Sequence, residues 1–110
     1  MTIYNLVKDD TQPQFQITCT RSDTGAVIDL TGATVRAYFR KKGTDTVLFT
    51  MNGVNSGTNF QNGIVIFNFS SGQLNLPEAY YEAEIEITHQ TGGIETIFET
   101  LDFFVREDFN

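Results

Sequence analysis

The 110-residue sequence lacks the residues that several kinds of functional site require. It has no tryptophan, one histidine (His89) and one cysteine (Cys19). A single cysteine cannot form an internal disulfide, which agrees with a reducing compartment. A zinc site usually takes three or four histidine and cysteine ligands, and this chain has only these two. We therefore expect no metal, no other cofactor, and a stability that comes from packing.

Long apolar runs and a leader pattern are also missing. No apolar stretch approaches the roughly 20 residues that cross a bilayer. Residues 1–5 show no basic region followed by an apolar one, so no secretory signal is expected. Seven Lys and Arg stand against 14 Asp and Glu, a formal net charge of −7. This sign disfavours nucleic acid and anionic membranes as partners, and we expect a soluble protein made in a cytoplasm.

Apolar residues are plentiful, and their spacing is that of strands. Hydrophobic residues make up 40% of the chain, with ten Phe and four Tyr, which is enough for one core in a single domain over residues 1–110. Period-two alternation over 15–19, 33–39 and 81–87 puts apolar side chains on one face of each stretch. About seven such runs, without a long helix, predict an all-β fold, an antiparallel immunoglobulin-like β-sandwich.

The remaining segments are predicted from turn-forming residues and local hydropathy. Residues 41–45 indicate a hairpin turn between antiparallel strands. The composition of 52–62 favours a long exposed loop, and the start of 64–69, apolar on both faces, is typical of a central strand. Residues 70–78 have room for one helical turn. Residues 94–106 are predicted as one long or bent strand.

No constellation of catalytic residues is visible in the sequence. His89 stands in a predicted hairpin turn beside two glycines, where a solvated side chain is expected rather than a general base. Cys19 is predicted to be a small buried residue, because the alternation over 15–19 points it inward. A calcium site built from Asp9, Asp10 or the stripe of Glu82, Glu84 and Glu86 is an open alternative, because hard cations take oxygen ligands, but the spacing matches no calcium loop. We therefore expect a non-enzymatic protein with no catalytic and no metal-binding residues.

The most strongly charged feature is an acidic stripe formed by Glu82, Glu84 and Glu86. These carboxylates recur every second residue, about 7 Å apart on one strand face. Acid–base catalysis by an exposed face is disfavoured, whereas contact with a basic surface is expected to steer assembly and to weaken with salt. Two arrangements are open. The basic residues belong to another copy and form an interface, or they pair with the stripe within one chain, in which case its role is only structural. The candidate protein-interface residues are Glu82, Glu84, Glu86, Arg36, Arg40, Lys41 and Lys42.

Two stretches carry motifs beyond the general strand pattern. The first runs from Leu6-Val7-Lys8-Asp9-Asp10-Thr11 to Asp29-Leu30-Thr31-Gly32-Ala33-Thr34-Val35, and the second from Gly63-Ile64-Val65-Ile66-Phe67 to Pro77-Glu78-Ala79-Tyr80-Tyr81-Glu82-Ala83-Glu84. Together they resemble the N-terminal domain family of phage baseplate upper proteins, and the Asp29–Val35 motif is the most distinctive part. The chain departs from that family at Glu78-Ala79, where a glycine more often precedes the tyrosine.

The resemblance implies a virion structural or assembly module, made in the host bacterial cytoplasm. Its partners would be other phage structural proteins, at a baseplate, a neck, a fibre attachment or a capsid surface. Exposed strand edges also allow a homo-oligomer. The alternative is a carbohydrate-binding β-sandwich, since Tyr38, Tyr80 and Phe60 are candidates for exposed aromatic side chains.

Overall fold

Almost all regular structure in this protein is β-strand. The computed structural model describes residues 3–21, 23–97 and 100–107. The elements in this part of the chain are β1 (Ile3–Val7), β2 (Gln14–Thr18), β3 (Thr34–Lys41), β4 (Val47–Asn52), the 3-10 turn η1 (Phe60–Asn62), β5 (Ile64–Asn68), β6 (Ala79–Thr88), β7 (Ile94–Thr96) and β8 (Leu101–Arg106). Over these residues, no helix has the length and apolarity needed to cross a membrane.

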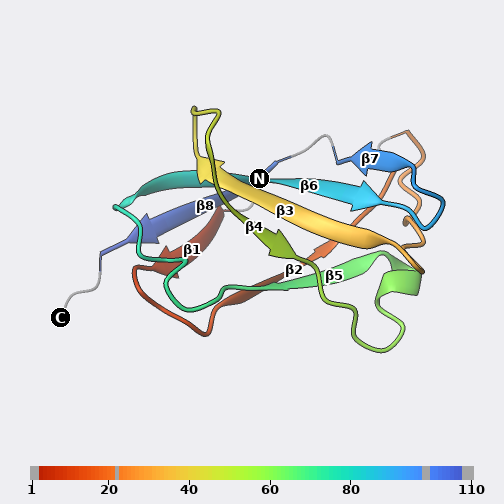
Figure 1. Cartoon of the computed structure of the whole chain (residues 1–110), viewed down its shortest axis with the longest axis horizontal. Coiled ribbons are helices and arrows are strands. Elements are labelled where there is room, and N and C mark those ends of the chain that lie inside the picture. The colour runs from red at the N-terminus through yellow and green to blue at the C-terminus, as the bar shows by residue number, and fades with distance from the viewer. Residues whose placement is uncertain (1–2, 22, 98–99, 108–110) are drawn as a thin grey trace.

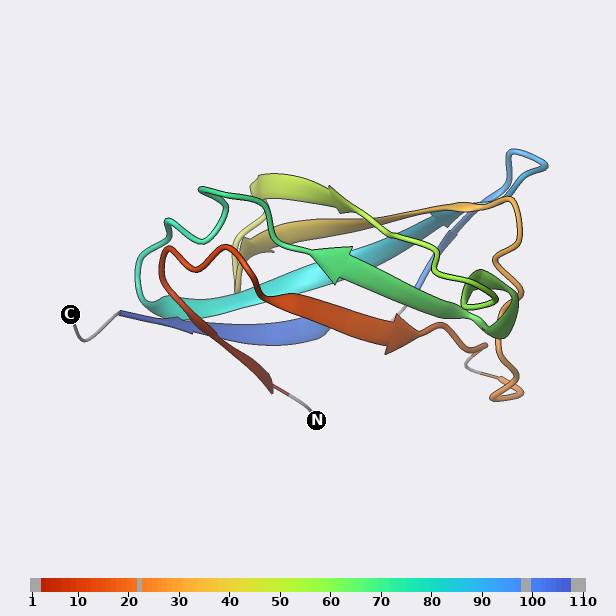
Figure 2. The ribbon, with the colours of Figure 1, turned by 90° about the horizontal axis from the view of Figure 1, so that it is seen from below.

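The strands form two sheets that pack face to face (Figures 1 and 2). The large sheet has the order β1-β8-β6-β3-β4, with β7 also paired to β6, and the small sheet is β2-β5. The pairs are antiparallel except for β1 and β8, which run parallel. The order β8-β6-β3-β4 corresponds to strands G, F, C and C′ of a variable-type immunoglobulin domain, and β2-β5 to strands B and E. The predicted immunoglobulin-like sandwich is confirmed.

A tyrosine corner fixes the entry into β6. The side chain of Tyr81 is buried, and its hydroxyl donates a hydrogen bond of 2.7 Å to the backbone oxygen of Pro77. Immunoglobulin domains use the same device near the start of strand F. Burial raises the pKa of Tyr81, so the hydroxyl remains a donor. Ala83 stands where an antibody domain has its second cysteine, and packing here takes the place of a disulfide.

Aromatic rings fill the core between the sheets. Phe39 stacks on Tyr81 with ring centroids 5.6 Å apart, and Phe15 stacks on Phe67 at 5.0 Å. Phe103 contacts both clusters, at 5.1 Å from each of Phe15 and Phe39. The residues predicted to face inward are confirmed as buried at Phe15, Cys19, Val35, Ala37, Phe39, Tyr81, Ala83, Ile85 and Ile87, while Ile17 and Ala33 are half-buried.

The predicted exposed loop at 52–62 is partly wrong. Phe60 is buried, and its backbone N–H donates to the side-chain oxygen of Asn55 at 3.0 Å. Val54 forms a β-bridge with Ile66 of β5. A lone aromatic among turn-forming residues has no period, so the sequence pattern did not show that this segment closes one end of the core.

Two other predicted elements also differ. β5 is not a central strand, because it pairs with β2 on one side and has only the bridge to Val54 on the other. Residues 71–74 form turns without a helical turn. The segment 94–106 contains two strands, β7 and β8, which pair with different parts of β6. Positions 98–99 of that segment lie outside the described residues.

The Asp29–Val35 motif starts β3. The carboxylate of Asp29 accepts hydrogen bonds from the backbone N–H (3.0 Å) and the hydroxyl (2.6 Å) of Thr31, which lower the pKa of Asp29. Leu30 is buried, and Gly32 has a φ of 76°, a left-handed conformation that favours glycine. Each of these residues therefore has a role in the turn that leads into the strand.

Candidate functional site

The acidic stripe lies on the outer face of the large sheet, between β3 and β8. The antiparallel register pairs Arg36 with Glu86, Tyr38 with Glu84, and Arg40 with Glu82. Cross-strand neighbours of this kind have Cβ atoms about 5 Å apart, within reach of opposite charges. The fold thus brings the predicted acidic and basic residues together within one chain.

The contacts along this register are unequal. Arg40 Nε lies 2.9 Å from Glu82 Oε1, and the side chain of Glu82 is only 12% exposed. The hydroxyl of Tyr38 donates to Glu86 Oε1 at 3.0 Å, and this bond raises the pKa of Tyr38. Glu84 is exposed and has no hydrogen bond or ion pair within the described residues. Glu82 and Glu86 therefore contribute to the sheet, and Glu84 remains accessible to a partner.

A buried carboxylate extends this charged array onto β8. The side chain of Asp102 is 5% exposed, and Lys42 Nζ lies 3.3 Å from its Oδ1. Asp102 is also the cross-strand neighbour of Glu82, so two adjacent carboxylates each have their own cation. Lys41, by contrast, is exposed and makes no ion pair within the described residues.

Sequence reasoning did not identify Asp102. Strand alternation places it on the outward face, opposite in direction to the buried Phe103 and Val105, and outward positions are normally solvated. The only signal was a charged residue within an otherwise apolar segment. Its cation, Lys42, comes from the turn between β3 and β4, which is distant in the sequence.

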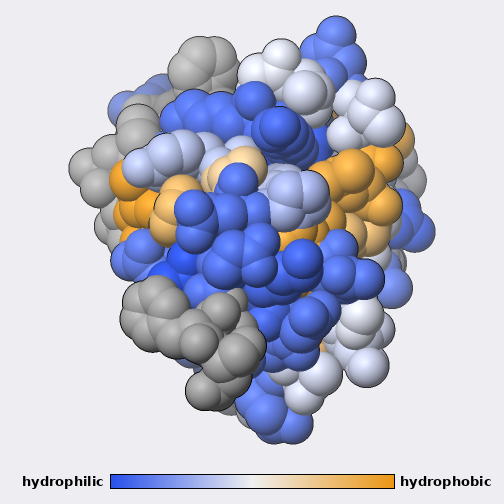
Figure 3. Space-filling model, turned by 90° about the vertical axis from the view of Figure 1, so that its left-hand side faces the viewer, coloured by the Kyte–Doolittle hydropathy of each residue, from blue (hydrophilic) through white to orange (hydrophobic). Residues whose placement is uncertain are grey.

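Of the three aromatic residues considered for sugar binding, one is exposed. Tyr80 is 53% exposed, and its ring lies 4.8 Å from that of Phe104 on the neighbouring strand. Tyr38 is half-buried and Phe60 is buried. Figure 3 looks at the left-hand end of the sandwich in Figure 1, and shows a mainly hydrophilic surface interrupted by apolar patches.

The outer face of the small sheet contains no charged side chain. Residues 11–20 and 46–77 have no Asp, Glu, Lys or Arg, and these stretches hold β2, β4, η1 and β5. We call the outward positions of β2 and β5 the neutral face: they are Gln14, Gln16, Thr18, Ile64, Ile66 and Asn68. Contact at this face brings no like charges together, although the chain carries a formal net charge of −7.

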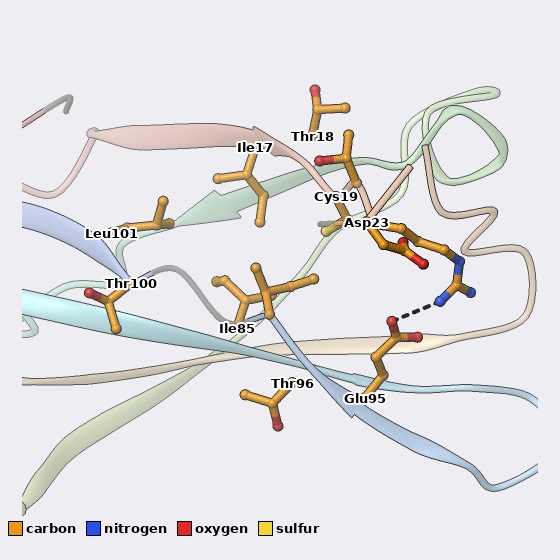
Figure 4. Close-up of a pocket in the computed structure, with 12 residues that line it drawn as sticks. Ile17, Thr18, Cys19, Asp23, Ile85, Glu95, Thr96, Thr100 and Leu101 are labelled. Atoms are coloured by element: carbon orange, nitrogen blue, oxygen red, sulfur yellow. Dashed lines mark hydrogen bonds and ion pairs between the residues drawn. The ribbon is translucent and has the colours of Figure 1, made fainter. Parts of the chain in front are cut away.

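A cleft of about 570 Å³ opens beside β2, between the two sheets. Ile17 of β2 and Ile85 of β6 point toward one another across it, and Leu101 of β8 lines it as well (Figure 4). At its rim, the guanidinium of Arg21 binds Glu95 at 3.0 Å (Figure 4). The cleft is therefore apolar inside and polar at its opening.

His89 and Cys19 do not form a catalytic pair. His89 Nε2 lies 3.0 Å from Glu95 Oε1, so this histidine is tied to the rim and is not the solvated turn residue that was predicted. Burial raises the pKa of Cys19 from 9.0 to about 11, with a smaller contribution from the charge of Glu95. A protonated thiol is a weak nucleophile. No group of three or more His, Cys, Asp and Glu among the described residues is arranged to hold a metal ion.

Comparison with known proteins defines the class of fold. No family model matches the sequence, and no curated protein matches it significantly. Among solved structures, the chain is similar to the crystal structure of CopC from Methylosinus trichosporium OB3b, with a TM-score of 0.53 over 100% of this chain and 89% of that chain. The two sequences are 9% identical, so the likeness shows the β-sandwich fold alone.

Proposed function

We propose that this chain is a non-enzymatic docking module of a bacteriophage particle. The observation that carries the docking function is the neutral face, a regular surface free of charge on a chain with a formal net charge of −7. Interfaces bury their central residues, where charged side chains are depleted because desolvation is costly. A surface of amides, one hydroxyl and half-buried isoleucines satisfies this requirement.

The bacteriophage context rests on the two segments that resemble the baseplate family. The Asp29–Val35 motif forms the turn into β3, and the Pro77–Glu84 segment contains the tyrosine corner. Both are positions where the sequence determines the backbone, so the resemblance is concentrated at residues that specify a particular sandwich. This supports a shared architecture, and the virion location follows from it as a proposal.

The outer side of the large sheet has a secondary role in this proposal. We call it the charged face: it holds Arg36, Arg40, Glu82, Glu84, Glu86 and Asp102, together with Lys41 and Lys42 at the end of β3. Glu82 is paired with Arg40, Glu86 accepts the bond from Tyr38, and Lys42 is paired with Asp102. Arg36 is half-buried, so Glu84 and Lys41 are the exposed members of the predicted interface without an ion pair among the described residues. The remaining net negative charge steers a basic partner at long range, and this steering weakens with salt.

Particle composition tests the proposal. Cryo-microscopy and mass spectrometry of purified virions should find the protein at defined symmetric positions. Incorporation of Asn68→Lys, which places a charge on the neutral face, should fall well below that of Glu84→Lys, which changes the charged face. Absence of the protein from mature virions would contradict the bacteriophage function, and equal incorporation of both variants would contradict docking through the neutral face.

A carbohydrate-binding function is the second candidate, because Tyr80 is exposed and backed by Phe104. Sugar rings stack on aromatic side chains that are held flat by a neighbour. A glycan array should then give hits with the wild-type chain that disappear with Tyr80→Ala. An array without hits removes this candidate.

A further inference from the structure

β2 has the least protected strand edge in the described part of the chain. It pairs with β5 on one side and, among the described strands, with none on the other. The outer edge of β5 is bridged by Val54, the β4 edge carries a register irregularity, and β7 has only three residues. β1 is followed directly by Lys8, Asp9 and Asp10, whereas β2 lies in the uncharged stretch 11–20. Charges and irregularities are what normally prevent edge pairing.

The backbone groups on this edge can be identified from the bonds on the other side. Cys19 N donates to Gly63 O at 2.7 Å, and Phe69 N donates to Pro13 O at 3.2 Å. Odd-numbered positions of β2 therefore face β5, since direction alternates along an antiparallel strand. The N–H and C=O groups of Gln14, Gln16 and Thr18 face the free edge.

We propose that this edge pairs with β2 of a second copy, antiparallel and centred on Gln16. Gln14 then lies opposite Thr18 of the second copy, and Gln16 lies opposite its own counterpart. Each of these three pairs joins residues whose backbone groups face the edge, and together they exchange about six hydrogen bonds. This inference rests on the proposed docking function and specifies one partner, a second copy of the chain. It can be tested without knowing where the protein lies in a virion.

The side chains are compatible with this register. Phe15 meets Ile17 of the second copy on the inner side, and amides and hydroxyls meet on the outer side, so no like charges are opposed. Ile17 is half-buried and lines the open cleft beside β2 (Figure 4). A strand added at this edge extends the two-stranded sheet over the cleft and buries apolar surface that faces water in the single chain.

A second copy suits this edge better than a charged partner does. Two chains that each carry a formal net charge of −7 repel, and an uncharged contact adds no further like-charge repulsion. The sequence of β2 is symmetric in character about Gln16: an apolar residue stands on each side of it, and a polar residue follows in both directions. A two-fold contact requires such a pattern. The two-fold contact is isologous and closed, so it yields a dimer and no filament.

The molecular mass in solution tests this inference. A five-residue edge makes a small contact, so the dimer is expected to be weak, and sedimentation equilibrium should cover chain concentrations up to about 1 mM. The wild-type mass should rise from 12.4 kDa toward twice that value. Gln16→Pro removes an N–H that faces the free edge, so the pairing with β5 is retained and the mass should stay monomeric. Gln16→Thr keeps the N–H and should dimerise, and circular dichroism confirms that all variants fold.

A charge placed on the two-fold axis gives a second readout. Gln16→Lys opposes two lysines and should weaken the dimer at least tenfold at low salt, with partial recovery at high salt. Gln61→Lys, an equal charge change on the exposed surface of η1, should not alter the mass. A wild-type chain that stays at 12.4 kDa throughout, or a Gln16→Pro variant that still dimerises, overturns the inference. A monomer found in virions, with incorporation lost in Gln16→Pro, overturns it too and assigns the edge to another protein's strand.

Discussion

The outer faces of the two sheets are built from equally regular strands but use opposite chemistry. On the large sheet, carboxylates of β6 and β8 meet cations of the β3 strand and its turn, as in the pairs Arg40–Glu82 and Lys42–Asp102. On the small sheet, outward positions hold amides, a hydroxyl and isoleucines. Charge pairs between strands favour one register, because a slip of one residue would oppose the wrong groups. The charged face therefore specifies strand pairing, whereas the neutral face carries the proposed docking contact.

The largest expected difference between the faces comes from adding three lysines to each. Reversing Glu82, Glu84 and Glu86 to Lys should lower the free energy of unfolding by on the order of 3 kcal/mol, because the guanidinium of Arg40 loses its partner and faces a like charge. Lysines at Gln14, Gln16 and Thr18, the exposed positions of β2, should cost less than about 1 kcal/mol, since these positions are solvated. Urea denaturation measures both, and equal losses would remove the distinction.

The pH dependence of stability should reveal a buried group behind the small sheet. The pKa of Cys19 is raised by burial from 9.0 to about 11. Because the folded-state pKa lies above that of the unfolded chain, the contribution of the protonated thiol is complete below about pH 9. It is lost as the pH rises to about 11, a decrease of about 2–3 kcal/mol.

Comparison with Cys19→Ala isolates this effect. Burial raises the pKa of Tyr81, and the hydrogen bond to Glu86 raises the pKa of Tyr38. Both tyrosines therefore also lower the free energy of unfolding at high pH. They are present in both proteins and cancel in the difference. The gap between wild type and Cys19→Ala in chemical denaturation should shift by about 2–3 kcal/mol between pH 8 and 11. Parallel pH profiles would show that folding does not shift the pKa of this thiol.

Two neighbouring lysines test the buried part of the charged face. Lys42→Ala leaves the carboxylate of Asp102 without its cation and should cost about 1–2 kcal/mol of stability. Lys41→Ala removes an equal charge from an exposed position and should change stability by less than about 0.5 kcal/mol. Thermal unfolding of the two variants, side by side, gives the answer. A similar effect for both would mean that net charge matters here and the specific pair does not.

The smallest effect concerns a single pair on the charged face. A double-mutant cycle with Arg40→Ala and Glu82→Ala should give a coupling energy of about 0.5–1 kcal/mol, because the pair is partly shielded from solvent. The coupling should decrease in 1 M salt. The same cycle applied to Arg36 and Glu82, whose register partners are Glu86 and Arg40, should give a coupling near zero.

Much of the fold could be predicted because it depends on local alternation. The inward residues of β3 and β6 follow a period of two, and Gly, Asp and Asn mark the turns between strands. The width of each sheet could not be predicted in this way. The apolar run at Ile64–Phe67 looks the same in a four-stranded sheet and in the two-stranded sheet that forms, since pairing partners are distant in the sequence.

The charged face could be predicted only in part, because local alternation gives the face of a strand but not the strand beside it. The common face of Glu82, Glu84 and Glu86 follows from their spacing, but the identity of the strand beside it does not. The burial of Asp102 and the bond between His89 and Glu95 both depend on side chains that the tertiary fold brings together. The neutral face was visible in the sequence as two uncharged stretches, and only the pairing of β2 with β5 shows that they form one surface.

The parallel pairing of β1 with β8 has a consequence for synthesis on the ribosome. Its register joins Ile3 to Asp102, so β1 must wait for its partner until the strands from β2 to β8 have been made. Contacts between such distant residues close a large loop and form slowly. At about 5–20 residues per second, translation keeps β1 without its partner for several seconds. During that interval its apolar residues are available to chaperones, and a stalled or truncated chain would present an open sheet edge to its neighbours.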